Sequence, residues 1–479
     1  MKLTGLLIVI LIISSQGCRI VVSNYDNVLK NISLDINKGN LKKAVHMADS
    51  VRSHTTDPGI QWKADSLKDI ACRIPLDFPL KEDTIIKKLS VLLPWPEVNE
   101  NLKKWESDGW LEYRLLEGEK RYFNRAASNL VRLISFHQHR HETDSLMSHS
   151  EELVTRKRMS EKIIRESAGS STPVEPLKME VVYTLTVCPD AVPDGETVRC
   201  WLPFPKENNP RQKDVYLTGS SNENFILAPD SCTHKTLYLE GKAEKGKPVT
   251  FRIAYTYISF GQYFVPFAVK PYNRNSSIFK KYTAEQPPQI NFSPKVRTLA
   301  DSIAGKETSP DQIVRKIFSW FNNSVPWTGA MEYSIMPDIP GYVISHLRGD
   351  CGMQTLLFMS MLRYKGIPCR WQSGWNMQPG FKNLHDWCEV YYEGPGWVPV
   401  DVEHKLQYSG DTSTREFYTC GIDPYRLIIN DGISGTLYPP KKYLRSEPYD
   451  FQRGEVEWKG GNLYFDKWDY NMTIKYLNQ

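Results

Sequence analysis

The sequence predicts a multidomain protein with an α-helical N-terminal region, then an antiparallel β-sandwich, then an α+β core. Apolar residues recur with a helical period up to about residue 166, whereas beyond about residue 176 they alternate as in strands. A third observation is an apolar helix pattern followed by a hairpin pattern within residues 349–404. At 479 residues the chain has room for about two to four domains.

Residues 1–18 read as an export signal rather than as part of the fold. Lys2 precedes an apolar run, Leu6 to Ile13, that is too short to cross a bilayer. The run ends in Ser-Ser-Gln-Gly-Cys, which resembles a bacterial lipoprotein signal, in which the cysteine is lipidated and becomes the first residue. We therefore expect lipidation of Cys18 and an exported protein on a bacterial cell membrane, facing the periplasm or the cell surface. An ordinary signal peptide cleaved nearby is the alternative.

Residues 22–166 are predicted to be helical. The expected helices are two within 27–51, turned at Lys38-Gly39-Asn40, and others at 63–71, 105–115 and 122–141. His137, His139 and His141 raise the question of a metal site, but only His137 and His141 share a helix face. A solvated helix end is the favoured interpretation, and no metal is expected.

A linker rich in small residues, 167–175, separates this region from a β-sandwich at 176–270. The expected strands are 179–187, 198–202, 214–217, 236–239 and 249–258. None of the nine cysteines forms a Cys-x-x-Cys knuckle, so the pattern does not indicate zinc. Two of Cys188, Cys200 and Cys232 could pair as a disulfide in an exported protein, and the sequence does not decide between pairing and free thiols.

The α+β core is expected at 271–405, led by helices at 294–303 and 312–322. In the second helix, Ile313, Ile317, Trp320 and Phe321 form a core-facing stripe. Residues 406–479 are expected to be a β-rich extension. Its strands, near 417–418 and 463–465, are expected either to cover an edge of the core sheet or to add a small β-element.

Cys351 lies between two glycines at the predicted start of a helix. An apolar run follows, and Gly366-Ile367-Pro368 ends the pattern, so the helix is predicted at 352–364. A thiolate at a helix N-terminus lies against free N–H groups and the positive end of the macrodipole. We therefore expect a lowered thiol pKa and backbone donors for an oxyanion.

His385 and Asp401 flank a predicted hairpin. Its β-rich runs, 387–392 and 397–400, are separated by Glu393-Gly394-Pro395-Gly396. Because side chains alternate along a strand, His385 and Asp401 share a face only if odd positions pair with odd positions. The turn does not fix that register.

Four motifs in order resemble those of the transglutaminase-like superfamily, a branch of the papain-like cysteine enzymes. They are the Cys351 helix, Leu-Arg-x-x-Gly-Ile-Pro-x-Arg at 362–370, His-x-Trp at 385–387 and Gly-Trp-x-Pro-x-Asp at 396–401. The resemblance implies that Cys351 is the nucleophile, His385 the general base and then acid, and Asp401 the carboxylate that orients the histidine. It also implies a second oxyanion donor upstream, for which Trp327, Asn322 and Asn323 are the candidates.

The neighbouring residues are expected to have simpler roles. Asp386 should point to the opposite face from His385, in a surface or structural role. For His404 a role on the surface or in a loop is favoured, and a role as a spare base is the alternative. Trp387 and Trp397 are expected to be core aromatics. The segment from Trp371 to Phe381 is the expected substrate-contacting loop.

Taken together, these features predict an exported cysteine acyl-transfer enzyme. Hydrolysis of a peptide or isopeptide amide through a Cys351 thioester is favoured. A protein-glutamine transamidase with the same triad and a non-catalytic binding or scaffold lipoprotein are the alternatives. The expected partners are a peptide or protein substrate and, through the lipid anchor, a membrane. No cofactor is expected, and a formal charge of only +5 with no basic block argues against nucleic acid binding.

Overall fold

The computed structural model describes residues 25–138, 151–167, 170–264, 268–406 and 409–477. The expected signal segment with Cys18 lies outside these residues, as do His139 and His141. The chain divides into two compact units, Met1–Leu130 and Val131–Gln479. Within the described residues, no helix is both long enough and apolar enough to cross a membrane.

The first unit is largely helical, as predicted. Residues 25–37 form a helix that turns at Gly39 into the next one, in agreement with the predicted helix pair. The others are α2 (Leu41–His54), α3 (Pro58–Asp77), α4 (Glu82–Leu92), α5 (Trp95–Ser107) and the beginning of α6 (Ala126–Gln138).

A small hairpin interrupts the helices, and here one prediction was wrong. In place of the helix expected at 105–115, α5 ends at Ser107 and a strand follows, whereas the helix expected at 122–141 is present as α6, which begins at Ala126. Between them β1 (Tyr113–Leu116) pairs with β2 (Glu119–Tyr122). The turn residues Glu117 and Gly118 both have positive φ, as a two-residue hairpin turn requires.

The second unit contains two five-stranded antiparallel sheets. The predicted strands at 179–187, 198–202, 214–217, 236–239 and 249–258 are all present, and the first of them begins at Val174, inside the expected linker. One sheet runs β12 (Gly421–Ile422), β8 (Val249–Tyr263), β3 (Val174–Val187) and β16 (Trp468–Tyr476), with β5 (Gln212–Ser220) also on β8. The other runs β15 (Gly461–Leu463), β14 (Glu455–Trp458), β4 (Thr197–Pro203), β7 (Thr236–Lys242) and β6 (Phe225–Leu227).

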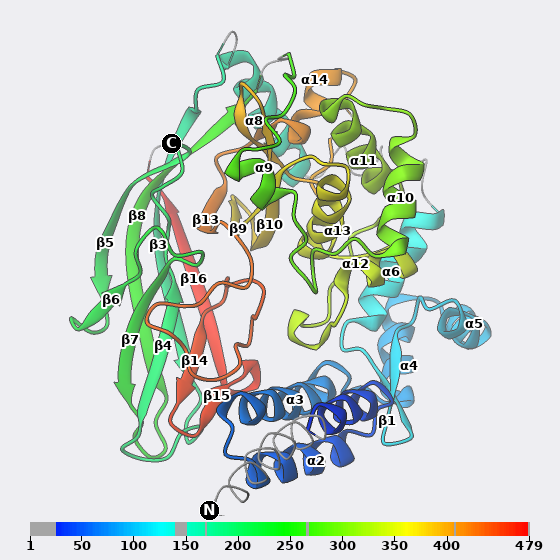
Figure 1. Ribbon diagram of the computed structural model, residues 1–479, viewed down its shortest axis with the longest axis vertical. Helices are drawn as coiled ribbons and strands as arrows, with labels where there is room; N and C mark the ends of the chain where they lie inside the picture. The colour runs from blue at the N-terminus through cyan, green and yellow to red at the C-terminus, as the bar shows by residue number, and fades with distance from the viewer. Residues whose placement is uncertain (1–24, 139–150, 168–169, 265–267, 407–408, 478–479) are drawn as a thin grey trace, which may run out of the picture. The chain divides into compact units, whose positions relative to one another are not determined.

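The C-terminal extension contributes strands to all three sheets of this unit, including β13 (Arg426–Asn430) at one edge of the core sheet. β16 pairs with β3 along its whole length, and β14 pairs with β4. Of the two expected closing strands, 417–418 is instead a 3-10 turn, η2 (Phe417–Thr419), and the other ends at Leu463 before η3 (Phe465–Lys467). The long strands from both ends of the unit lie side by side in Figure 1.

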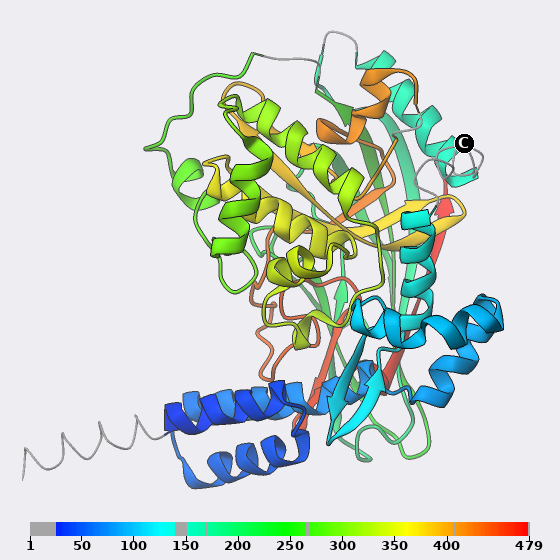
Figure 2. The same ribbon diagram turned by 90° about the vertical axis from the view of Figure 1, so that its right-hand side faces the viewer.

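The α+β core is built on a four-stranded antiparallel sheet. Its order is β11 (Gly396–Val400), β10 (Phe381–Tyr392), β9 (Cys369–Gln378) and β13 (Arg426–Asn430). Figure 1 shows this sheet between helices on one side and the long strands on the other, and Figure 2 shows the helices gathered over it. Buried residues of β9 and β13, including Trp375 and Leu427, belong to the same hydrophobic core as the two five-stranded sheets.

The helices of this unit include both leading helices that were predicted. They are α8 (Glu151–Glu166), α9 (Ser277–Tyr282), α10 (Pro294–Ala304), α11 (Pro310–Ser324), α12 (Ile339–His346), α13 (Cys351–Tyr364) and α14 (Thr412–Arg415), with the 3-10 turn η1 (Tyr333–Ile335). The central helix, α13, packs on β10 and β9 and is buried from Cys351 to Arg363. That burial explains why its sequence is apolar all round.

Candidate active site

Cys351 is the first residue of α13, as predicted. Asp350 caps the helix by accepting a hydrogen bond from the amide of Met353 at 3.0 Å, and the hydroxyl of Tyr333 donates to the same Asp350 oxygen at 2.6 Å. The amides of Cys351 and Gly352 donate to no acceptor within the described residues. Two free N–H groups therefore lie at the helix start, where an oxyanion could be received.

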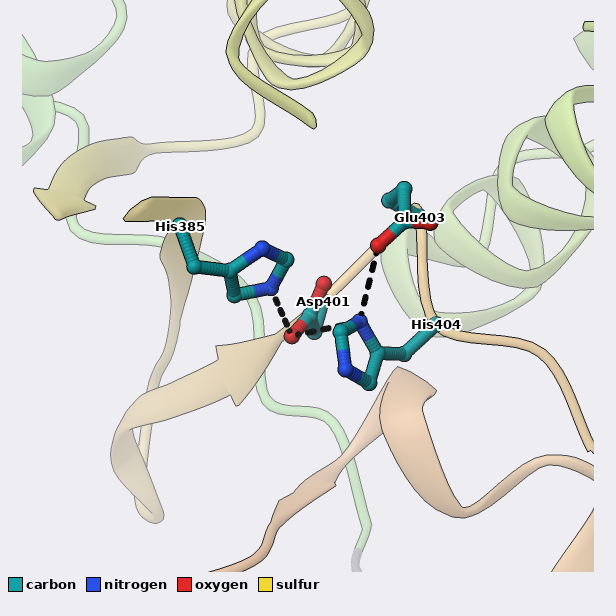
Figure 3. A group of neighbouring side chains, drawn as sticks. All are labelled: His385, Asp401, Glu403 and His404. Carbon is teal, nitrogen blue, oxygen red and sulfur yellow. Dashed lines mark hydrogen bonds and ion pairs between the residues drawn. The ribbon is translucent and has the colours of Figure 1, made fainter. Parts of the chain in front are cut away.

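His385 and Asp401 are brought together by the register of β10 and β11. Glu389 pairs with Pro399 and Tyr391 with Trp397, so odd positions face odd positions. His385 Nε2 lies 2.7 Å from Asp401 Oδ2. Figure 3 shows this bond, with the second ring nitrogen turned away from Asp401. Because a carboxylate only accepts, Nε2 carries the proton, and Nδ1 is left as an acceptor.

Asp401 is held ionised in the interior by its neighbours. Arg426 Nη2 donates to its Oδ2 at 2.8 Å, and Arg426 also contacts Asp423 at 3.2 Å. Although burial alone would raise the pKa of Asp401, His385, His404 and Arg426 together hold it well below its usual range. Burial lowers the pKa of His385, and the attraction of Asp401 offsets only part of that effect. The pair is therefore an ionised aspartate beside a neutral imidazole.

His404 lies in a loop, as one of the two expected placements had it, but it is buried within this cluster and not on the surface. Its ring centroid lies 4.5 Å from that of His385. Its Nδ1 lies 3.0 Å from Glu403 Oε2 and 3.4 Å from Asp401 Oδ2 (Figure 3). Burial would raise the pKa of Glu403, but the hydrogen bond with His404 and the electrostatic effects of His404 and His385 together bring that pKa to about 2.

Among the described residues, these four side chains form a group whose donor atoms suit a metal ion. His385, Asp401, Glu403 and His404 each offer a ligand atom, and these atoms lie within 4.8 Å of one another. Two imidazoles and two carboxylates suit a divalent transition metal. However, the Asp401 oxygen nearest to both histidines already holds His385 and Arg426. The contacts present are those of an acid–base pair.

The thiol of Cys351 faces Asp386, which is a second correction. Asp386 does point away from His385, as strand alternation requires, but it is buried and not on the surface. Its Oδ2 lies 3.4 Å from Cys351 Sγ. Within the described residues the thiol makes no hydrogen bond to His385.

The predicted lowering of the thiol pKa was also wrong. Burial raises the pKa of Cys351 well above its ordinary value, and any negative charge on the neighbouring Asp386, Asp350 and Glu403 raises it further. Burial, as the largest of these effects, outweighs the favourable helix end. The resting side chain is a thiol that must lose its proton during the reaction.

The remaining site predictions have mixed outcomes. Trp327 pairs through its backbone with Gly349, two residues before the cysteine, and its ring lies under Arg132 at 4.6 Å. Asn322 is buried in α11, and its carbonyl accepts from Lys405. The expected loop from Trp371 to Phe381 is instead mostly strand β9, with Trp371 buried.

Aromatic residues and cysteines near the site complete the comparison with the predictions. Trp387 is fully buried, as expected, and donates to Gln372. Trp397 is only partly buried and lies under Arg370, with 4.3 Å from the guanidinium to the ring centroid. Every cysteine in the described part of the chain is free. No disulfide therefore joins any two of Cys188, Cys200 and Cys232.

Three residues of the site were not found from the sequence. Arg426 comes from β13, a strand that the sequence pattern did not reveal. Asp450 lies beyond the expected core and accepts a hydrogen bond from Ser373, the residue paired with Asp386 on the neighbouring strand. The contact of Asp386 with Cys351 depends on the position of α13 over the sheet. The sequence predicts where this helix begins in the chain but not how it packs on the strands.

Comparison with known proteins identifies part of the chain. Residues 297–402 match the family model described as the transglutaminase-like superfamily. No curated protein matches the chain. This segment, which contains Cys351, His385 and Asp401, is therefore a transglutaminase-like domain.

Solved structures with a similar fold were also found. A candidate cysteine protease from Cytophaga hutchinsonii is 14% identical, with a TM-score of 0.44, and the match covers 64% of this chain and 92% of that one. The periplasmic domain of TgpA from Pseudomonas aeruginosa is 16% identical, with a TM-score of 0.27 and coverage of 55% and 95%. A candidate protease from Parabacteroides distasonis is 10% identical, with a TM-score of 0.20 and coverage of 49% and 64%.

Proposed function

From the transglutaminase-like domain at 297–402, we propose that this protein is a cysteine hydrolase of peptide or isopeptide amide bonds, with Cys351 as nucleophile, His385 as base and Asp401 as orienting carboxylate. The observation that carries the proposal is the 2.7 Å bond from His385 Nε2 to Asp401, which leaves Nδ1 as a free acceptor on a neutral ring. A base for a thiol needs both properties.

The reaction runs in two steps. In the first, the thiol proton moves to His385 Nδ1, the sulfur of Cys351 bonds to the substrate carbonyl, and the oxyanion is received by the amides of Cys351 and Gly352. The C–N bond then breaks as His385 returns the proton to the leaving amine. In the second, water gives a proton to His385 and attacks the thioester. The acid leaves, and the sulfur regains its proton.

Proton transfer requires the thiol to turn from Asp386 toward His385. A thiol is a weak hydrogen-bond donor, so little is lost when the Cys351 side chain rotates away from its 3.4 Å contact with Asp386. Hydrogen bonds of this kind are commonly long in a free enzyme and tighten once substrate binds.

We also propose that the protein acts outside the cytoplasm as a lipoprotein anchored through Cys18. The proposal rests on the short apolar run followed by Ser-Ser-Gln-Gly-Cys in residues 6–18. Growth with a labelled fatty acid tests it: the wild-type chain should take up the label, and Cys18→Ser should not. Label retained in Cys18→Ser would contradict the proposal.

The enzymatic proposal is tested with a mixed peptide library and mass spectrometry. The wild-type protein should produce new carboxyl termini, and Cys351→Ala should produce none while its melting temperature stays unchanged. Cys369→Ala is the matched control, because that buried thiol contacts a backbone carbonyl of α13 and lies apart from His385. Equal turnover by Cys351→Ala would rule out the proposal.

A primary amine added to the same assay distinguishes hydrolysis from transfer. We expect the acyl products to carry a hydroxyl from water, and the label from ¹⁸O water to appear in them. If the added amine replaces water in most of the product, the enzyme is a transamidase, and the hydrolase assignment fails.

A further inference from the structure

The carboxyl group next to the nucleophile is itself buried in a network of acids. Asp386 is 3% exposed, with Oδ2 at 3.4 Å from Cys351 Sγ. Its other oxygen accepts a hydrogen bond from Gln452 Nε2 at 2.8 Å. If Asp386 were ionised, its charge would oppose the thiolate that the proposed reaction requires.

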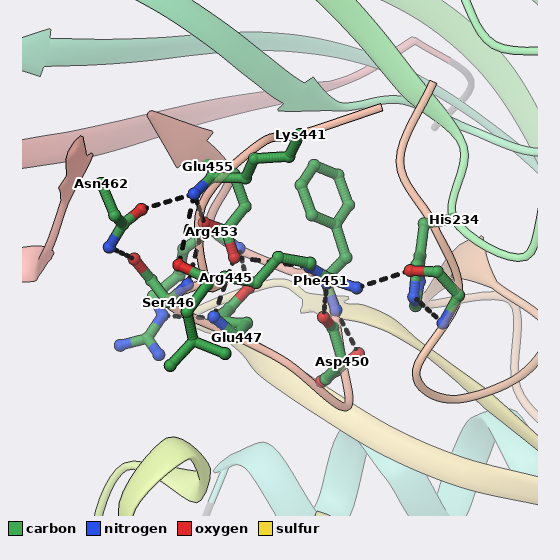
Figure 4. A network of polar contacts seen from close by, with 12 residues as sticks. His234, Lys441, Arg445, Ser446, Glu447, Asp450, Phe451, Arg453, Glu455 and Asn462 are labelled. Atoms are coloured by element: carbon green, nitrogen blue, oxygen red, sulfur yellow. Dashed lines mark hydrogen bonds and ion pairs between the residues drawn. The ribbon is translucent and has the colours of Figure 1, made fainter. Parts of the chain in front are cut away.

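A second buried carboxyl group, that of Asp450, lies next to Asp386. Asp386 pairs with Ser373 across β10 and β9, so their side chains share a face of the sheet, and Ser373 Oγ donates to Asp450 Oδ1. Figure 4 shows Asp450 within a polar network of the C-terminal loop, the segment 431–454 between β13 and β14. One Asp450 oxygen accepts three hydrogen bonds, from Ser373 Oγ at 2.5 Å, the amide of Phe451 at 2.7 Å and Asn430 Nδ2 at 3.2 Å. Three donors on one oxygen favour the ionised form of Asp450.

Two neighbouring buried carboxyl groups can form a hydrogen bond to each other only through a proton. Neither carboxylate has a hydrogen to donate, and two like charges side by side in a buried site are strongly disfavoured. Because the donors gather on Asp450, the proton belongs on Asp386, where no basic side chain is bonded. We propose that Asp386 and Asp450 share one proton, and that this proton keeps the carboxyl group beside Cys351 uncharged while the thiol is deprotonated.

The charged and titratable neighbours are consistent with this assignment. Asp386 faces Cys351 and Asp350 at the start of α13, Tyr333 of η1 and Asp450 of the C-terminal loop, and no cation among the described residues contacts it. The other charged groups near Asp450 come from the same loop. Arg445 donates to the backbone carbonyl of Asp450 and pairs with Glu455. Arg453 pairs with Glu447 and Glu332.

The pKa values point in the same direction. Burial raises the pKa of Asp386 well above its ordinary value, and the neighbouring Asp450 and Asp350 raise it further. Burial and the charge of Glu447 raise the pKa of Asp450 as well. Its hydrogen bonds offset part of this effect, so the pKa rises only to about 6. Asp386 is thus the weaker acid of the two, and it is the one in contact with the sulfur.

The inference rests on the proposed role of Cys351, and it makes Asp386 and Asp450 positioning residues, since they act through the thiol. The proton of the thiol still goes to His385. The shared proton removes a like charge from the vicinity of the sulfur, and a like charge at this distance raises a thiol pKa by about one unit or more.

Infrared spectroscopy detects the shared proton directly. At neutral pH the wild-type protein should show the carbonyl stretch of a protonated carboxylic acid, and Asp386→Asn should lose that band. Asp423→Asn is the matched control, because that buried carboxyl is ionised: the charge of Arg426 holds its pKa below the usual range against burial. The absence of the band from the wild type, or its survival in Asp386→Asn, would overturn the proposal.

Alkylation of Cys351 by iodoacetamide, followed by mass spectrometry, measures the effect on the thiol. Asp450→Asn removes the partner's charge and supplies an amide that can donate to Asp386. Both changes favour the ionised form of Asp386, so labelling at neutral pH should slow, by up to about tenfold. The double variant Asp386→Asn with Asp450→Asn should return to within about threefold of wild type, since no charge is left beside the sulfur.

A role limited to packing predicts the opposite pattern, with the double variant at least as impaired as Asp450→Asn. That result, or wild-type labelling by Asp450→Asn, would overturn the inference. Failure of the proposed function is recognised separately: if Cys351→Ala retains turnover, the hydrolase assignment falls, while the infrared band still decides whether the proton is shared.

Discussion

Arg426 and His385 share one oxygen of Asp401. Arg426 Nη2 donates to Asp401 Oδ2 at 2.8 Å, and His385 Nε2 donates to the same atom at 2.7 Å. All three side chains are buried. The guanidinium thus fixes the charge and the position of the carboxylate that orients the base.

Replacement of Arg426 by Met should therefore impair both the fold and the activity. It leaves Asp401 and Asp423 without their buried cation, which typically costs about 3–5 kcal/mol. Urea unfolding measures the stability, and peptide hydrolysis measures the activity. The control is Arg315→Gln, which breaks partly exposed ion pairs and should cost about 1 kcal/mol or less. Equal stability of the two variants would contradict the assigned role of Arg426.

The acidic limb of the pH–rate profile should lie below the usual histidine range. The base must be neutral to accept the thiol proton, so kcat/KM falls as pH drops through the pKa of His385. Burial lowers that pKa below its ordinary value of 6.5. A kcat/KM profile from about pH 4 to about pH 8 should thus hold its plateau below neutrality. A limb at or above the ordinary histidine pKa would show that His385 is not the buried base described.

His404→Gln should move that limb to higher pH. The electrostatic effect of His404 lowers the pKa of His385, so a neutral side chain in its place lets the pKa rise. His346→Gln, on the exposed end of α12, should leave the profile unchanged. A shift to lower pH in His404→Gln would mean that His404 supports the charged form of His385 instead.

Gly374 is the position where the core sheet tolerates no side chain. A Cβ there would lie 1.9 Å from the carbonyl oxygen of Leu427, on the neighbouring strand β13. Gly374→Ala should therefore separate β9 from β13, displace Arg426 and destabilise the protein by more than about 3 kcal/mol. Gly410→Ala, in open space, is the control and should be nearly neutral. Thermal unfolding decides, and similar melting temperatures for the two variants would count against this account.

The sequence predicted what depends on local pattern. Asp350 caps α13 and Gly366 follows its end with a positive φ, so the helix that carries Cys351 could be bounded from the sequence to within one residue. Strand alternation correctly placed Asp386 on the face opposite to His385. In both cases the residues that decide the structure are neighbours in the chain.

It did not predict what depends on packing between distant segments. Arg426 reaches Asp401 because β13 pairs with β9 across about fifty residues, and short strands of this kind carry little pattern of their own. Asp386 was assigned a surface or structural role and His404 a surface or loop role, because a lone polar side chain is usually solvated. Only the position of α13 and of the C-terminal loop makes them part of the site.

Gly352 provides a test of the close packing at the nucleophile. A Cβ at this position would lie 2.2 Å from Tyr333 Oη and 2.5 Å from Asp386 Oδ2, so both side chains need the glycine in order to approach Cys351. Alanine normally stabilises a helix relative to glycine by about 1 kcal/mol. We expect Gly352→Ala instead to displace these two groups and to lower kcat by about tenfold or more. Adding Tyr333→Phe removes the nearest atom and should restore part of the loss, a coupling that kinetic double-mutant cycles measure. Strictly additive losses would mean that the glycine is required for some reason other than the approach of Tyr333.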